Sequence, residues 1–315
     1  MPALDEFVID SSMAGRRPCQ FDADAVQRWA EFSGDENPIH FSADHAARFG
    51  LAGVVAHGML VLVPVESAAV DTLPAAGPDT WHQFRAFFRK PVPIGASCML
   101  NVGLNHRRVQ FSVDAAAKSA QGVADCYVRG YYGTVDGPAA ADDAGPDEQG
   151  SLPWQTVSTD TLHSRHAAFS RIAGREPASQ WAFLSSLVFS EYLQSQLGPD
   201  VAQWAGATTG SGSAWKPEHL RRWDERDDIL VMQTALSVRH AAALRARSAN
   251  TPQAFESVHW RRTALRGINA ATELIGSVGL DLVIGPLAVA PQPQLQLEIS
   301  LVARRLTPQP DFVTA

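Results

Sequence analysis

Cysteine and lysine are both scarce in this chain. Its 315 residues include three cysteines, Cys19, Cys98 and Cys126, which form neither a CxxC pair nor a metal-ligand spacing. An odd number of cysteines without a framework is typical of a reducing compartment, so we expect a cytoplasmic protein. Only three of the 26 basic residues are lysines. We attribute that bias to genomic base composition rather than to chemistry.

Long apolar runs are also absent. The longest spans residues 54–65, and His57 and Gly58 interrupt it, so it is too short to cross a bilayer. The N-terminus reads MPALDEF, which is acidic and lacks the basic start and apolar core of a signal peptide. We therefore expect neither a secretory leader nor a membrane partner.

Positive charge is in deficit as well. The formal net charge of −7 argues against nucleic acid or an anionic membrane surface as the main partner. Hydrophobic residues make up 45% of the chain, which is enough to build real cores. A length of 315 residues suits two domains of ordinary size.

One segment near the middle has the composition of a linker. Residues 136–150 read DGPAAADDAGPDEQG, rich in Pro, Gly, Ala and acids and without apolar periodicity. We therefore predict one domain over residues 1–135 and a second over residues 151–315.

The two predicted domains show a similar order of elements. The first half reads as helices over residues 22–34 and 42–50 and from His57, followed by strands over residues 82–95, 96–108, 109–119 and 123–134. The second half reads as a helix that starts near Ser179 and is closed by Gly198, followed by strands over residues 229–240, 242–249, 254–266 and 295–306. The stretch 204–228 resembles a loop or a broken strand. This order indicates an α+β fold, duplicated, in which each sheet wraps a central helix.

The segment FSGDENPIHFSADHAARFG, residues 32–50, carries the main chemical signal. Asp35 and His40 bracket a short loop between two helices, and Asn37 and Pro38 are residues that shape such loops. A carboxylate and an imidazole side by side can hold one water and move its proton. The alternative is that Asp35 and Asn37 merely cap the next helix.

A second signal lies in VVAHGML, residues 54–60, where Gly58 stands at a predicted helix start. The first N–H groups of a helix have no intrahelical partner, and the helix dipole adds positive potential there. A carbonyl oxygen placed against the Gly58 N–H would be stabilised as it gains negative charge. The neighbouring His57 is either a substrate contact or a buried histidine bonded to the backbone.

These strings together resemble a known family. The chain resembles the MaoC-like dehydratase and hydratase-2 family in three strings, which are SGDENPIH, then AHGML, then FRKPVPIG. Members of that family carry a pattern close to GDxNPIHxD, then a Gly-containing helix start, then a Phe-rich strand that ends in a Pro and Gly turn. The resemblance covers roughly residues 21–134. Ser42 departs from it, since the family often has Asp there, and this bears on the subfamily more than on the chemistry.

The resemblance implies a hot-dog fold and a thioester substrate carried on coenzyme A or an acyl carrier protein. It gives the catalytic roles to Asp35 and His40, which would add or remove water across the C2–C3 double bond. It gives Asn37 a supporting role in the active site and Gly58 the contact with the thioester oxygen. Together with His57, whose role is open, these are the expected substrate-binding residues. It implies neither a metal nor another cofactor.

The second half contains no DxNPxH string, so we expect it to be a degenerate hot-dog unit. The chain would then be a double hot-dog, that is, a pseudo-dimer within one polypeptide. The sequence leaves open whether two whole chains also form a homodimer. Related two-unit hydratases commonly carry the pair in the C-terminal half, and the reversal here suggests a specialised biosynthetic pathway. We expect the acyl chain to run toward large apolar residues of the second half, namely Trp181, Phe183, Leu184, Leu187 and Phe189.

The leading hypothesis is therefore an (R)-specific hydratase or dehydratase of enoyl- or 3-hydroxyacyl-thioesters. One alternative keeps the site and adds an amine to the enoyl thioester, or hydrolyses the thioester, because the same pair can activate other groups. Another alternative, from a different class, is a non-catalytic acyl-thioester-binding protein.

Overall fold

The computed structural model describes residues 15–118, 122, 124–138, 152–173, 179–207, 229–245, 257–270, 273–289 and 291–305. The elements of the first half are β1 (Gly15–Cys19), α1 (Ala23–Ser33), η1 (Pro38–His40), α2 (Ala43–Arg48), α3 (Gly58–Thr72), β2 (Trp81–Phe88), β3 (Cys98–Asn105), β4 (Arg108–Lys118) and β5 (Ala124–Val135). Those of the second half are β6 (Gln155–Val157), α4 (Thr159–Ala173), α5 (Gln180–Ser195), α6 (Leu197–Ala207), β7 (Ile229–Ala241), η5 (Ala242–Arg245), β8 (Val258–Ala270), β9 (Glu273–Ile284) and β10 (Leu295–Arg305).

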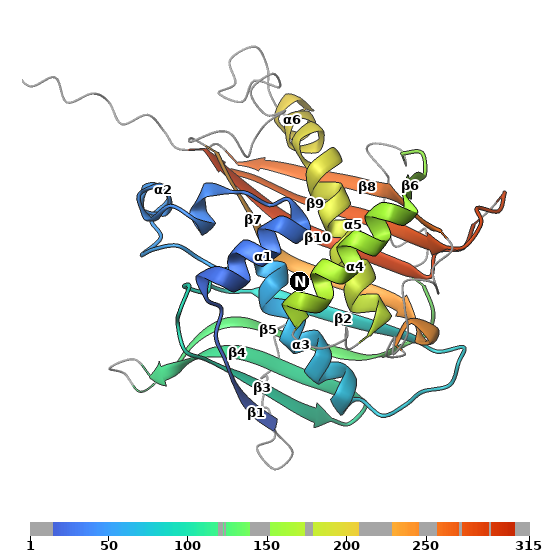
Figure 1. Cartoon of the computed structure of the whole chain (residues 1–315), viewed down its shortest axis with the longest axis horizontal. Helices are drawn as coiled ribbons and strands as arrows, with labels where there is room; N and C mark the ends of the chain where they lie inside the picture. Colours follow the sequence, from blue (N-terminus) through green and yellow to red (C-terminus); the bar gives the residue numbers. More distant parts are fainter. Residues whose placement is uncertain are drawn as a thin grey trace, which may run out of the picture.

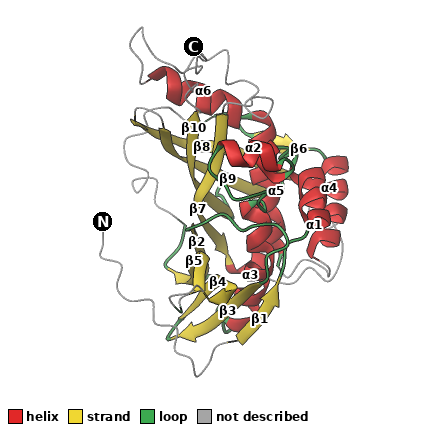
Figure 2. Cartoon of the chain, turned by 90° about the vertical axis from the view of Figure 1, so that its left-hand side faces the viewer, coloured by secondary structure: helices red, strands yellow, loops and turns green. Residues whose placement is uncertain are grey.

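All the strands belong to one curved ten-stranded antiparallel sheet (Figure 1). Figure 2 shows that α1, α3, α4 and α5 gather on one face of this sheet. The strand order is β1-β3-β4-β5-β2-β7-β10-β9-β8-β6. Read from its own edge inward, the second half runs β6-β8-β9-β10-β7 and so repeats the order of the first. The expected double hot-dog fold is confirmed, and β2 and β7 join its two units.

The domain boundaries stay a prediction. Most of the expected linker, from residue 139 onward, lies outside the described residues, as does residue 151. Among the described residues, no helix is both long and apolar enough to cross a membrane.

Two long buried helices lie inside the sheet's curve. α3 begins at Gly58 and packs against β3 and β4, and α5 begins at Gln180 directly after Ser179, so both start where the sequence predicted. Twelve of the 16 residues of α5 are buried. A helix that is apolar on every side is stable only when its neighbours cover it, as the sheet and the other helices do here.

Three details of the second half correct the sequence prediction. α5 ends at Ser195, and Gly198 lies in the first turn of α6 instead of closing α5. Residues 242–245 form the 3₁₀ helix η5 and not a strand, and Arg245 there donates hydrogen bonds to the carbonyls of Val70 and Pro74 at the end of α3. The strand β9 was not predicted at all. Most of the unassigned stretch 204–228 lies outside the described residues.

Buried rings fill the centre, where β2 meets β7. The ring centroids of Trp181 and His240 lie 4.9 Å apart, with 10° between the planes. The hydroxyl of Tyr132 meets Nε2 of His240 at 3.2 Å, while Nδ1 of His240 donates to the Ala241 carbonyl. Trp181 is therefore a core residue, and so is the buried Trp260.

Candidate active site

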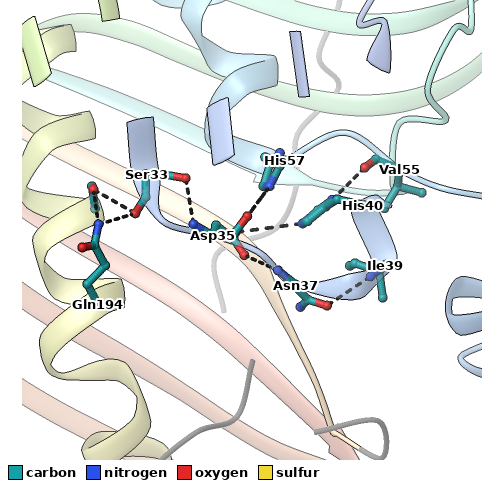
Figure 3. A network of polar contacts seen from close by, with 9 residues as sticks. Ser33, Asp35, Asn37, Ile39, His40, Val55, His57 and Gln194 are labelled. Atoms are coloured by element: carbon teal, nitrogen blue, oxygen red, sulfur yellow. Dashed lines mark hydrogen bonds and ion pairs between the residues drawn. The ribbon is translucent and has the colours of Figure 1, made fainter. Parts of the chain in front are cut away.

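The loop after α1 carries the predicted acid–base residues, and its own side chains define its shape (Figure 3). α1 ends at Gly34, whose φ of 70° is a left-handed conformation that favours glycine. The Asp35 N–H donates to Oγ of Ser33, and Oδ1 of Asp35 accepts from the Asn37 N–H at 3.3 Å. Oδ1 of Asn37 accepts from the Ile39 N–H and begins η1. Asn37 is buried and supports the loop from within.

The second half fixes this loop from behind. Nε2 of Gln194 donates to the Ser33 carbonyl at 2.7 Å, and Oγ of Ser190 donates to the same carbonyl at 2.9 Å. These bonds satisfy a carbonyl at the end of α1 that has no intrahelical partner. A Cβ on Gly34 would lie 2.6 Å from Nε2 of Gln194, so a larger residue here would push the Gln194 amide away from the Ser33 carbonyl.

Asp35, His40 and His57 meet at one point. Nε2 of His40 lies 3.9 Å from Oδ2 of Asp35, too far for a direct hydrogen bond but within reach of a shared water. Nδ1 of His40 lies 2.7 Å from the Val55 carbonyl, which can only accept. In the neutral ring the proton is therefore on Nδ1, and Nε2 presents its lone pair beside the carboxylate.

His57 supports the pair. Its ring stacks on that of His40 with centroids 3.7 Å apart, and its Nε2 donates to the Asp35 carbonyl at 3.0 Å. Of the two interpretations from the sequence, the geometry favours the buried histidine bonded to the backbone. His57 also lines the cavity described below, and its buried Nδ1 has no protein partner among the described residues.

Burial keeps both histidine rings neutral in the ground state by lowering their pKa values. Burial lowers the pKa of His40, against the opposing pull of the Asp35 carboxylate and the Val55 carbonyl. Burial and the adjacent His40 lower the pKa of His57 to about 4. Both rings are therefore neutral near pH 7, and a neutral His40 is the form that accepts a proton.

Gly58 opens α3 beside this trio. The cap residue His57 makes no side-chain hydrogen bond to the helix start, so the first N–H groups of α3 stay available. A Cβ on Gly58 would lie 2.9 Å from Oε1 of Gln233 and 3.2 Å from the Phe88 ring. A larger residue at position 58 would displace the Gln233 amide or the Phe88 ring, both of which line the cavity described below.

A cavity of about 390 Å³ contains Asp35, His40, His57 and Gly58 in its wall. It lies beside the point where the central strands part, since the pairing of β2 with β7 stops at Phe87 and Ala235. The second half supplies much of the remaining wall, through Phe189, Leu193, Leu197, Val231, Met232, Gln233, Thr234, Leu301 and Arg304.

The expected acyl-lining set needs correction. Of the five apolar residues of α5 named from the sequence, Phe189 lines the cavity. Trp181, Phe183, Leu184 and Leu187 are buried in the main core instead. Sequence reasoning also missed Gln194 and Gln233, because no local pattern connects them to residues 35–58.

The same trio is the group of described residues whose ligand atoms lie close enough, within 4.8 Å, to hold a metal ion. A carboxylate and two imidazoles are suitable ligand types for zinc. The nitrogen of His57 that faces the Asp35 carboxylate is, however, a donor to a backbone carbonyl and so carries a proton. The present arrangement fits proton transfer better than metal binding.

Comparison with known proteins gives one family match and a set of similar folds. The family model described as MaoC like domain matches residues 6–120. A solved MaoC domain protein from Chloroflexus aurantiacus J-10-fl aligns with 93% of this chain and 95% of its own, with 11% identity and a TM-score of 0.50. The dehydratase domain of PpsC from Mycobacterium tuberculosis aligns with 94% of this chain and 96% of its own, with 13% identity and a TM-score of 0.42. No curated protein sequence matches the chain.

Proposed function

We propose, from the match of residues 6–120 to the MaoC-like family model, that this protein is a lyase that adds water to enoyl-thioesters or removes it from 3-hydroxyacyl-thioesters. One observation carries the proposal. A neutral histidine and a carboxylate, with Nε2 and Oδ2 3.9 Å apart, share a cavity with a helix start whose first N–H groups no side chain caps.

In the hydration direction, Asp35 and Nε2 of His40 hold a water beside C3 of the substrate. The pair takes one proton as the water oxygen bonds to C3, and the electrons of the C2–C3 double bond move toward the thioester oxygen. The Gly58 N–H stabilises the charge on that oxygen. The pair then returns one proton to C2, and dehydration is the reverse.

The stereochemistry is part of the same proposal. Asp35 and His40 approach the double bond from one side, so the proton and the hydroxyl are added to the same face. We propose the (R)-3-hydroxyacyl product, in accordance with the resemblance to hydratase 2.

The carrier is a coenzyme A or acyl-carrier-protein thioester in this proposal. Arg89, Lys90 and Arg304 are exposed residues along the cavity. Guanidinium and ammonium groups suit the phosphates at the far end of a pantetheine arm. The second half, which lacks the DxNPxH string, closes the cavity and holds the catalytic loop.

The test is product analysis on a panel of enoyl-CoA substrates. We expect mass spectrometry to find the mass of one added water and chiral chromatography to find the (R)-3-hydroxyacyl-CoA. Free coenzyme A would instead indicate a thioesterase, and an adduct formed only when amines are added would indicate the amine-adding alternative. Saturable binding without any product would indicate an acyl-thioester-binding protein and would contradict the proposal.

A further inference from the structure

The strand β7 carries a bulge at the edge of the cavity. Ala235 pairs with Ser300 and Gln233 pairs with Leu301, so Thr234 is an extra residue with no partner on β10. A bulge re-aims the side chains next to it and is often found beside active sites. Here Val231, Met232, Gln233 and Thr234 all line the cavity, whereas consecutive residues of a regular strand face opposite sides.

Gln233 is the residue of this run that reaches Gly58. Its Oε1 lies 2.9 Å from the point where a Cβ on Gly58 would be. Its Nε2 meets Sδ of Met59 at 3.6 Å, and a thioether is a weak acceptor. The amide therefore lies beside the start of α3. A carbonyl oxygen is a stronger acceptor than the sulfur, so the hydrogen bond from Nε2 would move to that oxygen when a thioester binds.

We propose that Gln233 is a catalytic residue that donates a hydrogen bond from Nε2 to the thioester oxygen, together with the Gly58 N–H. The inference rests on the proposed function and extends it to the half of the chain that lacks the acid–base pair. No proton is transferred in this step. Two neutral donors, one from each half, stabilise the oxygen as it gains charge. Rotation about the last side-chain bond of Gln233 exchanges the positions of Oε1 and Nε2, so Nε2 can turn toward this oxygen.

A purely structural role for this amide is the weaker explanation. Its hydrogen-bond neighbour is the sulfur atom of Met59, so the contact adds little stability, and methionine or leucine would fill the same volume. A glutamine that follows Val231 and Met232 in the cavity wall is explained when its amide meets a polar group of the ligand. Polar groups that fix orientation are few in such pockets and are placed at the reacting end.

The decisive variant is Gln233→Met, which keeps the length of the side chain and removes the amide. We expect kcat for hydration to fall by about 100-fold, the usual loss when one oxyanion donor is removed. Gln233→Asn keeps the amide on a shorter side chain, so its kcat should lie between those of the wild type and Gln233→Met. The matched control is Gln83→Met on the neighbouring strand β2, where the amide donates to Oγ of Ser237, and its kcat should equal that of the wild type.

A spectroscopic measurement separates this role from loss of packing. In an Asp35→Asn background, which holds substrate without turnover, a conjugated enoyl-CoA should show an absorption red shift on binding, because hydrogen bonds polarise its carbonyl. Adding Gln233→Met should reduce the red shift while the dissociation constant changes by less than about threefold, since uniform binding is little affected.

The outcomes are distinct. An unchanged red shift in the double variant overturns the role of Gln233, and so does a kcat for Gln233→Met within about threefold of the wild type, a loss far below that expected for an oxyanion donor. If the wild type hydrates no substrate, the proposed function fails, but the red shift still decides whether Gln233 contacts the carbonyl. If Gln233→Met does not fold, kcat and the red shift are measured for Gln233→Asn instead. Wild-type values of both would overturn the role of Gln233.

Discussion

Gln194 of α5 donates a hydrogen bond of 2.7 Å to the carbonyl of Ser33, two residues before Asp35. The residues of this bond are 161 positions apart in the chain, and they connect the half without the acid–base pair to the loop that carries it. The second half thus acts on the site twice, through Gln194 behind the loop and through Gln233 in the cavity wall.

Replacing Gln194 by methionine should therefore lower activity from outside the cavity. The Ser33 carbonyl would keep the hydroxyl of Ser190, so we expect a stability loss of about 1 kcal/mol. The loop would shift, and kcat should fall by about tenfold, less than the 100-fold that a misplacement of 1 Å can cost. Urea denaturation and steady-state kinetics measure both effects. The control is the exposed Gln203→Ala, and equal kcat values for the two variants would refute the positioning role.

Gly58→Ala tests the space at the start of α3. The added methyl group would meet Oε1 of Gln233 at 2.9 Å and the Phe88 ring at 3.2 Å, where the thioester oxygen should lie. We expect kcat/KM to fall by at least about 100-fold, as for removal of an oxyanion donor. Gly53→Ala is the matched control, because a Cβ there meets nothing within 4 Å. A Gly58→Ala enzyme with the kinetics of the control would show that the substrate does not approach this N–H.

From the burial of Glu66 in α3 we predict an unusual pH dependence of the free energy of unfolding. Glu66 is 1% exposed, its Oε1 has no partner among the described residues, and burial raises its pKa well above the ordinary value. Above the ordinary glutamate pKa of about 4.3 the unfolded chain is ionised while the folded chain retains the proton, so this group lowers stability as pH rises.

Glu66→Gln should remove that dependence. We expect the variant to be more stable than the wild type, by a margin that grows between pH 5 and pH 8 in urea denaturation. The exposed Glu31→Gln serves as the control. A margin that shrinks with rising pH would mean that the carboxylate is stabilised by a charge or a donor in the fold.

The predictable part of this protein is the local part. The loop with Asp35 and His40, and the start of α3 at Gly58, depend on short-range preferences of Asn, Pro and Gly, so the sequence alone indicated the pair and the helix. β9 was missed because Gly276 and Gly279 weaken a strand pattern. A Cβ on Gly276 would lie 2.5 Å from the Trp204 ring, a long-range packing demand that no local pattern contains.

The contributions of the second half were unpredictable for the same physical reason. Gln233 faces the cavity because of a bulge at Thr234, and the bulge is defined by the register of β7 against β10. Register depends on which strands meet, so a single strand's sequence does not fix it. His57 was left open between two roles, and its hydrogen bond to the Asp35 carbonyl, 22 residues away in the chain, favours the structural one.

The most direct test of the account is the hydration rate of Asp35→Asn and of His40→Ala on the best enoyl-CoA substrate. Each variant should keep the wild-type circular dichroism spectrum and lose at least about 100-fold in kcat, the scale expected for an acid–base group. Asp44→Asn and His106→Ala, which alter the same residue types away from the cavity, should keep the wild-type rate. Folded Asp35→Asn and His40→Ala proteins with near-wild-type rates would contradict the assignment of the pair.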